Sequence, residues 1–399
     1  MIQKSQFDAS ASMLGYLYQV RYGLYISLEK LLDVDDPDQF NVSIEKLDDI
    51  GFDKEGTATE LLQTKFHGKP GNLTNRSPDI WKTIRVWVES IKNKKIELGR
   101  VLLTLVTTQS LTTDTIASYL SVGNERNPDK ALELMVKICT EDNAANANGY
   151  KAFQTLSKAE KQALVHSIYF VGKSDDLLQI RSKINRFGRQ SVSYEAVEAF
   201  VDRLEGVWFK WCIEKLSQNP SGVINLGMLQ DLIDKLRPEY SQTNLPAEFA
   251  DKLPDIITID EDLRLFIQQL RLFNAPKNMI ELAIINYYRA FEQRTKWSVD
   301  GLLNPGELSQ YDRKLCEQWK EQQSFLEAME IIENEQDKLR YSVKLYQQCF
   351  SKGVVPIRHD FTEAYVSKGS YQLLADQLTI GWHPDYLDNL GDASNEGVA

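Results

Sequence analysis

Long apolar runs are missing from this 399-residue chain, since no stretch approaches the roughly 18 consecutive apolar residues that cross a bilayer. The N-terminal stretch MIQKSQFDASASM also lacks the apolar core of an export signal. These two absences argue against a membrane-spanning or exported protein. We expect a cytoplasmic protein that makes no contact with a membrane.

Cysteine and histidine are scarce, with four of each in the chain. The cysteines lie at least 33 residues apart and form no CxxC pair, which argues against a zinc site or a disulfide framework. His359 and His383 each have a neighbouring aspartate but no second histidine at ligand spacing, so we expect neither to be catalytic. The segment GKSDD, residues 172–176, lacks the GxxxxGK pattern, which excludes nucleotide hydrolysis in this chain.

The chain has fewer basic than acidic residues, and its formal net charge is −11. An overall negative charge argues against nucleic acid as a partner. Residues 60–100, however, hold nine basic residues against four acidic ones. A basic island in an acidic protein is a candidate surface for a polyanion, although a solvated helix face gives the same pattern. The DNA contacts that we predict on this island are Lys69, Arg76, Lys82 and Arg85.

What the chain does have is enough apolar sequence, 42% of its residues, to bury a core, and enough length for two domains. Apolar spacing predicts a long amphipathic helix over 13–32, a strand over 40–53, a turn at Gly56 and a second strand over 59–67. A helix begins at Ser77, Pro78 and Asp79, with the Ser77 hydroxyl as its cap, and a buried strand covers 101–108. This order, α-β-β-α-β, predicts an α/β core of the restriction-endonuclease-like kind.

The rest of the chain reads mostly as helix. Helical sequence covers about 110–160 and 176–216, separated by the strand candidate HSIYFVG. We place a domain boundary near residue 218, at SQNPSG, giving a first domain over 1–218 with a helical insertion and a helical second domain over 219–399. In the second domain periodic segments occur near 223–237, 261–273, 277–296 and 307–350.

The polar residues of the predicted hairpin are candidates for chemistry. Side chains alternate across a strand, so Gln63, Lys65 and His67 share one face, and the hairpin brings Asp49 beside them. A carboxylate and an amide oxygen suit Mg²⁺ or Mn²⁺, and an ammonium group beside them suits phosphodiester hydrolysis. Ordinary surface polars on a hairpin are the competing interpretation.

Two further residues receive secondary roles. Glu45 shares the strand face of Asp49, but four residues of strand span roughly 13 Å, so we rank Glu45 as a lesser metal ligand. His67 is either a phosphate contact or a polar residue at the rim of the strand. Trp81 belongs to the apolar stripe of its helix, whereas Trp87 fits either the core or base stacking.

Four motifs in this order resemble one nuclease family, the double-stranded DNA endonuclease domain of CBASS effectors and of the Lamassu nuclease subunit. They are GYLYQ at 15–19, SIEKLDDI at 43–50, LLQTKFH at 61–67 and SPDIWKTIRVW at 77–87. The resemblance covers about residues 10–110 and implies that Asp49, Gln63 and Lys65 are catalytic, with Gln19 near the metal. Gln19 departs from the glutamate that some restriction-like enzymes carry on this helix, which puts a direct ligand role in doubt.

The C-terminal segment, residues 367–390, is similar to the ends of effectors in ABC three-component defence systems, of which Lamassu is one. This resemblance implies three kinds of partner: an SMC- or Rad50-like ABC ATPase that restrains the nuclease, a small accessory subunit, and further copies of the chain when it cuts DNA. Two alternatives stay open. One is a non-catalytic adaptor that binds DNA or an ATPase, and the other is a nuclease activated by a cyclic nucleotide, as in CBASS.

Overall fold

The computed structural model describes residues 10–69, 71–218, 222–257, 259, 261–351 and 353–391. The chain divides into two compact units. The first, which we call the α/β unit, comprises Met1–Ser191 and Ala199–Lys235. The second, the helical unit, comprises Val192–Glu198 and Leu236–Ala399. None of the described helices is both long enough and apolar enough to span a membrane.

The α/β unit is built on a six-stranded mixed sheet with the order β7-β5-β3-β2-β1-β8. Its strands are β1 (Phe40–Ile44), β2 (Ile50–Lys54), β3 (Thr57–Lys65), β5 (Leu102–Thr107), β7 (Ile168–Val171) and β8 (Ile224–Asn225). Strands β1, β2 and β3 pair antiparallel, whereas β3, β5 and β7 pair parallel. A separate parallel pair joins β4 (Asn72–Leu73) to β6 (Ser110–Leu111).

The predicted hairpin around Gly56 is confirmed, because β2 and β3 pair across it and Gly56 has a φ of 83°. The single strand predicted over 40–53 is wrong. The chain reverses between Ile44 and Ile50, where Glu45 adopts a left-handed φ of 55° and its amide donates to the Asp49 carbonyl at 3.0 Å. The physical reason is that two apolar segments, each long enough for one strand, flank a polar stretch that carries the turn.

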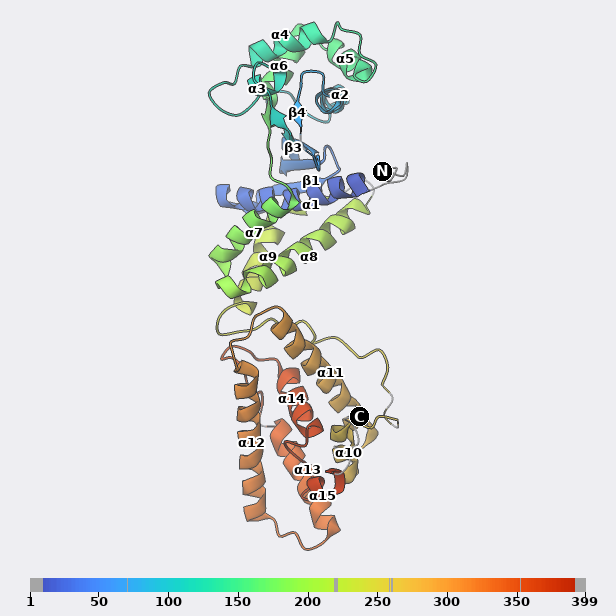
Figure 1. Cartoon of the computed structure of the whole chain (residues 1–399), viewed down its shortest axis with the longest axis vertical. Coiled ribbons are helices and arrows are strands. Elements are labelled where there is room, and N and C mark those ends of the chain that lie inside the picture. The colour runs from blue at the N-terminus through green and yellow to red at the C-terminus, as the bar shows by residue number, and fades with distance from the viewer. Residues whose placement is uncertain are drawn as a thin grey trace. The chain divides into compact units, whose positions relative to one another are not determined.

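Helices cover both faces of the sheet (Figure 1). Helix α1 (Ser10–Asp33) crosses one face, where its Gly23 lies against the side chains of Ile44 and Ile50. The other face is covered by α2 and the segment between β5 and β7. The helices there are α2 (Pro78–Lys92), α3 (Ile116–Tyr119), α4 (Pro128–Ile138), α5 (Ala147–Gln154) and α6 (Lys158–Ser167). Helices α7 (Leu177–Ser191), α8 (Val197–Leu216) and α9 (Leu226–Glu239) follow.

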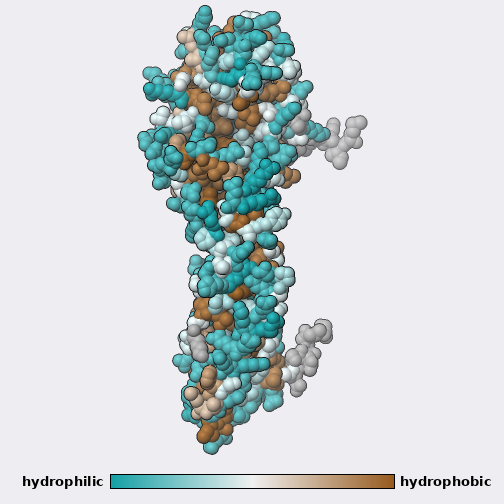
Figure 2. Space-filling view, turned by 90° about the vertical axis from the view of Figure 1, so that its left-hand side faces the viewer, coloured by the Kyte–Doolittle hydropathy of each residue, from teal (hydrophilic) through white to brown (hydrophobic). Residues whose placement is uncertain are grey.

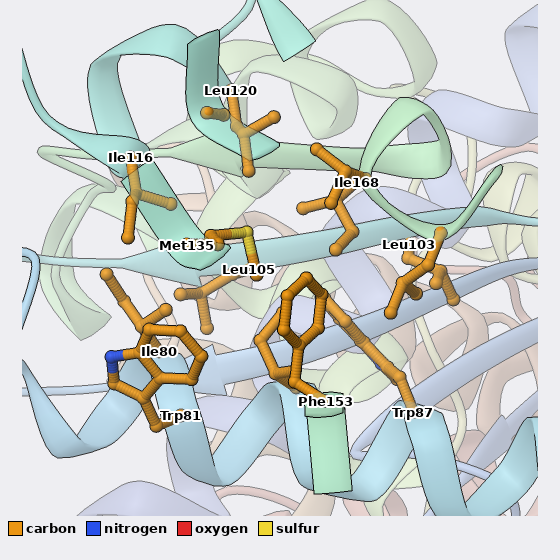
Figure 3. Packing of buried hydrophobic residues seen from close by; sticks show 14 of the residues in the cluster. Ile80, Trp81, Trp87, Leu103, Leu105, Ile116, Leu120, Met135, Phe153 and Ile168 are labelled. Carbon is orange, nitrogen blue, oxygen red and sulfur yellow. The ribbon is translucent and has the colours of Figure 1, made fainter. Parts of the chain in front are cut away.

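The main core of the α/β unit lies between the sheet and α2 (Figure 3). Leu103 and Leu105 of β5 meet Ile80, Trp81 and Trp87 of α2, and all five are fully buried. The expected core role of Trp81 is therefore confirmed, and Trp87 is also core rather than a surface for base stacking. Large side chains of this kind supply most of the apolar burial that holds a helix on a sheet.

Helix α2 begins as predicted, with Ser77 at its N-cap and Pro78 at its first position. The predicted hydroxyl cap is wrong, since the Ser77 side chain makes no cap hydrogen bond. The acidic residue of the first turn, Asp79, instead contacts the His67 ring, with 2.8 Å between Oδ2 and Nε2. The start of α2 is thus tied to the segment that follows β3.

The helical unit contains no strand within its described residues, which confirms the predicted change from an α/β to an all-helical architecture. Its helices from Leu265 onward are α10 (Leu265–Leu272), α11 (Lys277–Val299), α12 (Glu307–Met329), α13 (Glu335–Ser351), α14 (Ala364–Asp376) and α15 (Tyr386–Leu390). The periodic segment over 307–350 is two helices, separated by residues 330–334. Trp297 and Trp382 are fully buried and anchor the core of this unit.

Candidate functional site

Gln63 is the centre of the candidate site, because its side-chain amide bonds to both of the other predicted catalytic residues. Its Nε2 donates to Asp49 Oδ1, and its Oε1 accepts from Lys65 Nζ at 3.0 Å. Gln63 and Lys65 are two residues apart on β3, so their side chains leave the strand on the same face. The predicted convergence of an acid, an amide and an amine is therefore present.

Asp49 lies at the end of the Glu45–Asp49 turn, directly before β2. Its second carboxylate oxygen, Oδ2, accepts from the Thr64 backbone N–H at 2.7 Å and from the Thr64 hydroxyl at 2.9 Å. The Asp49 side chain is buried, and within the described residues no Lys or Arg forms an ion pair with it. Hydrogen bonds thus orient the Asp49 carboxylate, and no ion pair within the described residues neutralises it.

The Glu45–Asp49 turn also returns Glu45 to the site, which removes the distance argument that made it a lesser ligand. Burial raises the pKa of Glu45, and the charge of Asp49 raises it further, while a hydrogen bond from Gln19 and the charge of Lys65 lower it. Glu45 therefore feels the charges of both Asp49 and Lys65. The two carboxylates repel each other, and a cation between them would relieve that repulsion.

Gln19 reaches the same place from α1. It is buried, and its Oε1 has no hydrogen-bond partner within the described residues. A buried amide oxygen without a donor is costly unless something else contacts it. The orphaned oxygen is therefore a candidate ligand atom next to Glu45.

Asp48 is a site residue that the sequence did not indicate. Its Oδ2 accepts from Trp87 Nε1 at 2.5 Å and its Oδ1 accepts from the Asp49 N–H at 3.1 Å. Burial raises the pKa of Asp48 to about 7, and the charge of Asp49 acts in the same direction. Asp48 connects the core helix α2 to the candidate ligands, and only the DD pair in SIEKLDDI hinted at it.

The donors gathered here fit a hard divalent cation. Asp49, Glu45, Gln63 and Gln19 offer carboxylate and amide oxygens, the ligands that Mg²⁺ and Mn²⁺ accept. The described residues contain no cluster of three or more His, Cys, Asp or Glu able to hold a metal ion. The four donors named above are therefore two carboxylates and two neutral amides. We expect such a set to bind a divalent cation weakly until phosphate oxygens contribute.

The predicted DNA contacts differ in whether their side chains already form ion pairs. Arg76 forms a two-bond ion pair with Glu141, at 2.7 and 2.8 Å, and Arg85 lies 3.6 Å from Glu89. Lys69 and Lys82 are exposed, and within the described residues neither has a carboxylate partner. His67 is half-buried and paired with Asp79. The two predicted arginine contacts are thus partly neutralised, whereas the two predicted lysine contacts are not.

Comparisons with known proteins give a distant structural likeness and one family match. No curated protein matches the chain. Three structures of the Acinetobacter baumannii Cap4 SAVED/CARF-domain containing receptor are similar at 11–12% identity: one without a ligand in its description, one with 3'3'3'-cAAA and one with 2'3'3'-cAAA. They cover 70–73% of this chain and 64–69% of theirs, with TM-scores of 0.29–0.31, which are too low for a shared whole-chain fold.

The helical unit gives the more direct result. Residues 266–390, from α10 to the end of α15, match a family model of C-terminal domains. This range includes residues 367–390, where the sequence indicated the same class of system. The chain therefore carries a match to C-terminal domain 7 of the ABC-three component (ABC-3C) systems in its helical unit.

Proposed function

We propose that the chain is a metal-dependent double-stranded DNA endonuclease and the effector of an ABC-three component defence system of the Lamassu kind. The observation that carries the proposal is the double contact of Gln63, whose amide bonds to Asp49 on one side and to Lys65 on the other. Ordinary surface polars on a hairpin would stay exposed, whereas the Asp49 carboxylate is buried and Gln63 links it to the Lys65 ammonium group.

The chain's own residues divide the work of phosphodiester hydrolysis. Asp49, Glu45 and the Gln63 and Gln19 oxygens would hold Mg²⁺ or Mn²⁺. The bound ion would lower the pKa of water and neutralise charge on the phosphate. Lys65 orients the attacking water and donates a charge-assisted hydrogen bond to the phosphate oxygens as negative charge develops on them.

Hydrogen bonds hold these groups in place before substrate binds. Thr64 fixes one oxygen of Asp49 by two bonds, and Gln63 fixes the other. Asp48 holds the Asp49 backbone and is itself held by Trp87 of the core. Prior orientation of this kind lowers the cost of reaching the transition state, since little rearrangement is needed.

The helical unit supplies the partner contacts in this proposal: an SMC- or Rad50-like ABC ATPase, an accessory subunit and further copies of the chain. Supporting this, apolar side chains are exposed where α12 ends, with Met329 77% and Ile331 79% exposed. Figure 2 shows hydrophobic surface gathered at this end of the helical unit. Exposed apolar patches of this kind mark protein contacts.

The test compares purified full-length wild-type chain with Lys65→Ala, each with Mg²⁺ or Mn²⁺ and with EDTA, on linear and circular duplex DNA. We expect the wild type to cut DNA only with metal and Lys65→Ala to lose at least about 10²-fold in rate. Lys151→Ala, at an exposed lysine of α5, is the matched control. If wild type and Lys65→Ala behave alike in clean preparations, the nuclease proposal is wrong and the adaptor function takes its place.

A further inference from the structure

A hollow of 420 Å³ opens at the carboxyl ends of the parallel strands β3, β5 and β7. Among the residues that line it are His67, Thr108, Lys173, Ser174 and Gln179. Crevices at the carboxyl ends of parallel strands are common ligand sites, because the strands deliver several loops to one place. This hollow adjoins the candidate site, since the Lys65 carbonyl accepts from the Thr107 hydroxyl at 3.1 Å and from the Thr108 N–H at 3.4 Å.

The segment Gly172–Ser174, which follows β7, has an unusual backbone. A Cβ atom on Gly172 would lie 2.4 Å from Leu111 Cγ, so only glycine fits there. Lys173 then adopts a left-handed φ of 52°, and its amide donates to the Gln109 carbonyl at 2.7 Å. A long side chain in this conformation is uncommon and strained, and such residues gather at functional sites.

The charges around the hollow leave Lys173 available. It is exposed, and within the described residues it has no carboxylate partner. The two neighbouring acids are already in use: Asp175 pairs with Lys183, and Asp176 Oδ1 accepts the N–H groups of Leu178 and Gln179, each at 2.9 Å. A cation that forms no ion pair, beside hydroxyl groups, is a common phosphate-binding arrangement.

We infer that this hollow binds a backbone phosphate of the duplex DNA strand that passes the Lys65 site, with Lys173 as its charged contact. Lys65 and His67 are two residues apart on an extended segment, which spans roughly 7 Å, so one DNA strand can touch both places. The inference rests on the proposed function for its substrate. It assigns to GKSDD, residues 172–176, a role in holding DNA rather than in hydrolysing a nucleotide.

The test measures equilibrium binding of full-length chain to a fluorescent DNA duplex in EDTA, by anisotropy, over a series of KCl concentrations. We expect Lys173→Ala to weaken binding roughly 3- to 10-fold at moderate salt and to reduce the slope of log K against log[KCl] by about 1. Lys173→Arg should keep both values. Lys151→Ala, which also removes one exposed lysine of the α/β unit, should leave both unchanged.

A second variant tests the hollow by removing a negative charge from its lining. Asp176 lines it but also caps α7, and asparagine can replace it as a cap. Asp176→Asn should therefore strengthen DNA binding without loss of melting temperature. Equal affinity and slope for Lys173→Ala and wild type, or no binding by wild type, would overturn the inference.

Binding and cleavage separate this inference from the proposed function. If Lys173→Ala weakens binding as expected while the wild type never cuts DNA with metal, the hollow stands as a DNA-binding site and the nuclease proposal fails. If the wild type cuts DNA and Lys173→Ala binds it as the wild type does, the nuclease proposal stands and the hollow does not.

Discussion

The two units bury polar groups in opposite ways. In the α/β unit the buried acids are Asp48 and Asp49, which sit side by side, and within the described residues neither has an ion-pair partner. The described part of the helical unit buries no acid, and it buries four neutral amides, at Gln269, Gln293, Gln322 and Gln372. Gln269, for example, donates to the carbonyls of Ala375 and Ile380 and accepts from the Trp382 N–H.

In the proposed nuclease, this difference indicates that the buried acids serve catalysis and that the buried amides serve stability. A buried amide whose nitrogen and oxygen are both bonded, as in Gln269, links helices at little cost, whereas a buried carboxylate without a cation is expensive and survives only where something is gained from it. The acids lie at the candidate site, and the amides lie inside the domain that matches the ABC-3C family model. We therefore expect substitutions in the first unit to change activity before stability, and those in the second to change stability first.

The largest expected effect is on Asp49, the acid that defines the α/β unit in this comparison. Asp49→Asn keeps the side-chain size but removes the charge, so DNA cleavage with Mg²⁺ should fall by at least about 10²-fold. Plasmid nicking measures the rate, and circular dichroism melting reports the fold. Asp142→Asn, at an exposed position, serves as control. Cleavage at the wild-type rate by Asp49→Asn would break the comparison.

The second-largest effect is expected when one buried glutamine in each unit is replaced by glutamate. Gln63→Glu adds a third carboxylate to the candidate site, so melting temperature without metal should fall, and Mg²⁺ should restore it at a concentration roughly tenfold lower than the wild type needs. Gln372→Glu buries a charge next to the Tyr346 hydroxyl and should cost about 3 kcal/mol at neutral pH, with no rescue by Mg²⁺. Equal responses to Mg²⁺ would contradict the assignment of the metal site.

A smaller effect concerns the pH dependence that Asp48 confers. Its pKa of about 7 in the folded chain exceeds the value of about 3.9 for an unfolded aspartate. Between these values the folded chain holds a proton that the unfolded chain has released, so stability falls as pH rises from about 4 to 7. Asp48→Asn should flatten that decline in urea titrations of the whole chain, whereas Asp142→Asn should not.

The smallest effect is expected at His383 of the helical unit, where burial lowers the pKa of the imidazole. The folded chain then stays neutral where the unfolded chain takes up a proton, so stability is lost as pH falls below about 6.5. His383→Asn keeps an acceptor for the Asp385 N–H and should reduce this loss by a few degrees of melting temperature at most. An unchanged acid profile would show that His383 does not contribute to it.

Local pattern was enough to predict much of the α/β unit. The helix before the sheet, the Gly56 turn, the basic helix and the buried strand over 101–108 all occur where apolar spacing and turn residues indicated. Gln63 and Lys65 were found because a strand has a fixed two-residue period. The helices of the second unit were found by their own period, apart from the break over 330–334.

The features that we could not predict from the sequence depend on backbone conformation or on contacts between distant residues. The turn at Glu45 has no glycine, proline or asparagine to mark it, so two strands read as one. The role of Asp48 depends on its hydrogen bond from Trp87, which lies 39 residues further along the chain. Likewise, β8 is only two residues long and pairs with β1 from far along the chain, which no local pattern predicts.

Strand β3 joins an antiparallel partner, β2, to a parallel partner, β5, so both of its edges are occupied. A shift of register by one residue would have to break both ladders at once and would turn Gln63 and Lys65 to the opposite face. Gradual loosening of Gln63 and Lys65 is therefore a poor means of control. In the proposed nuclease, inhibition would instead act by blocking entry of DNA or by keeping copies apart, and its release would be an on-off step.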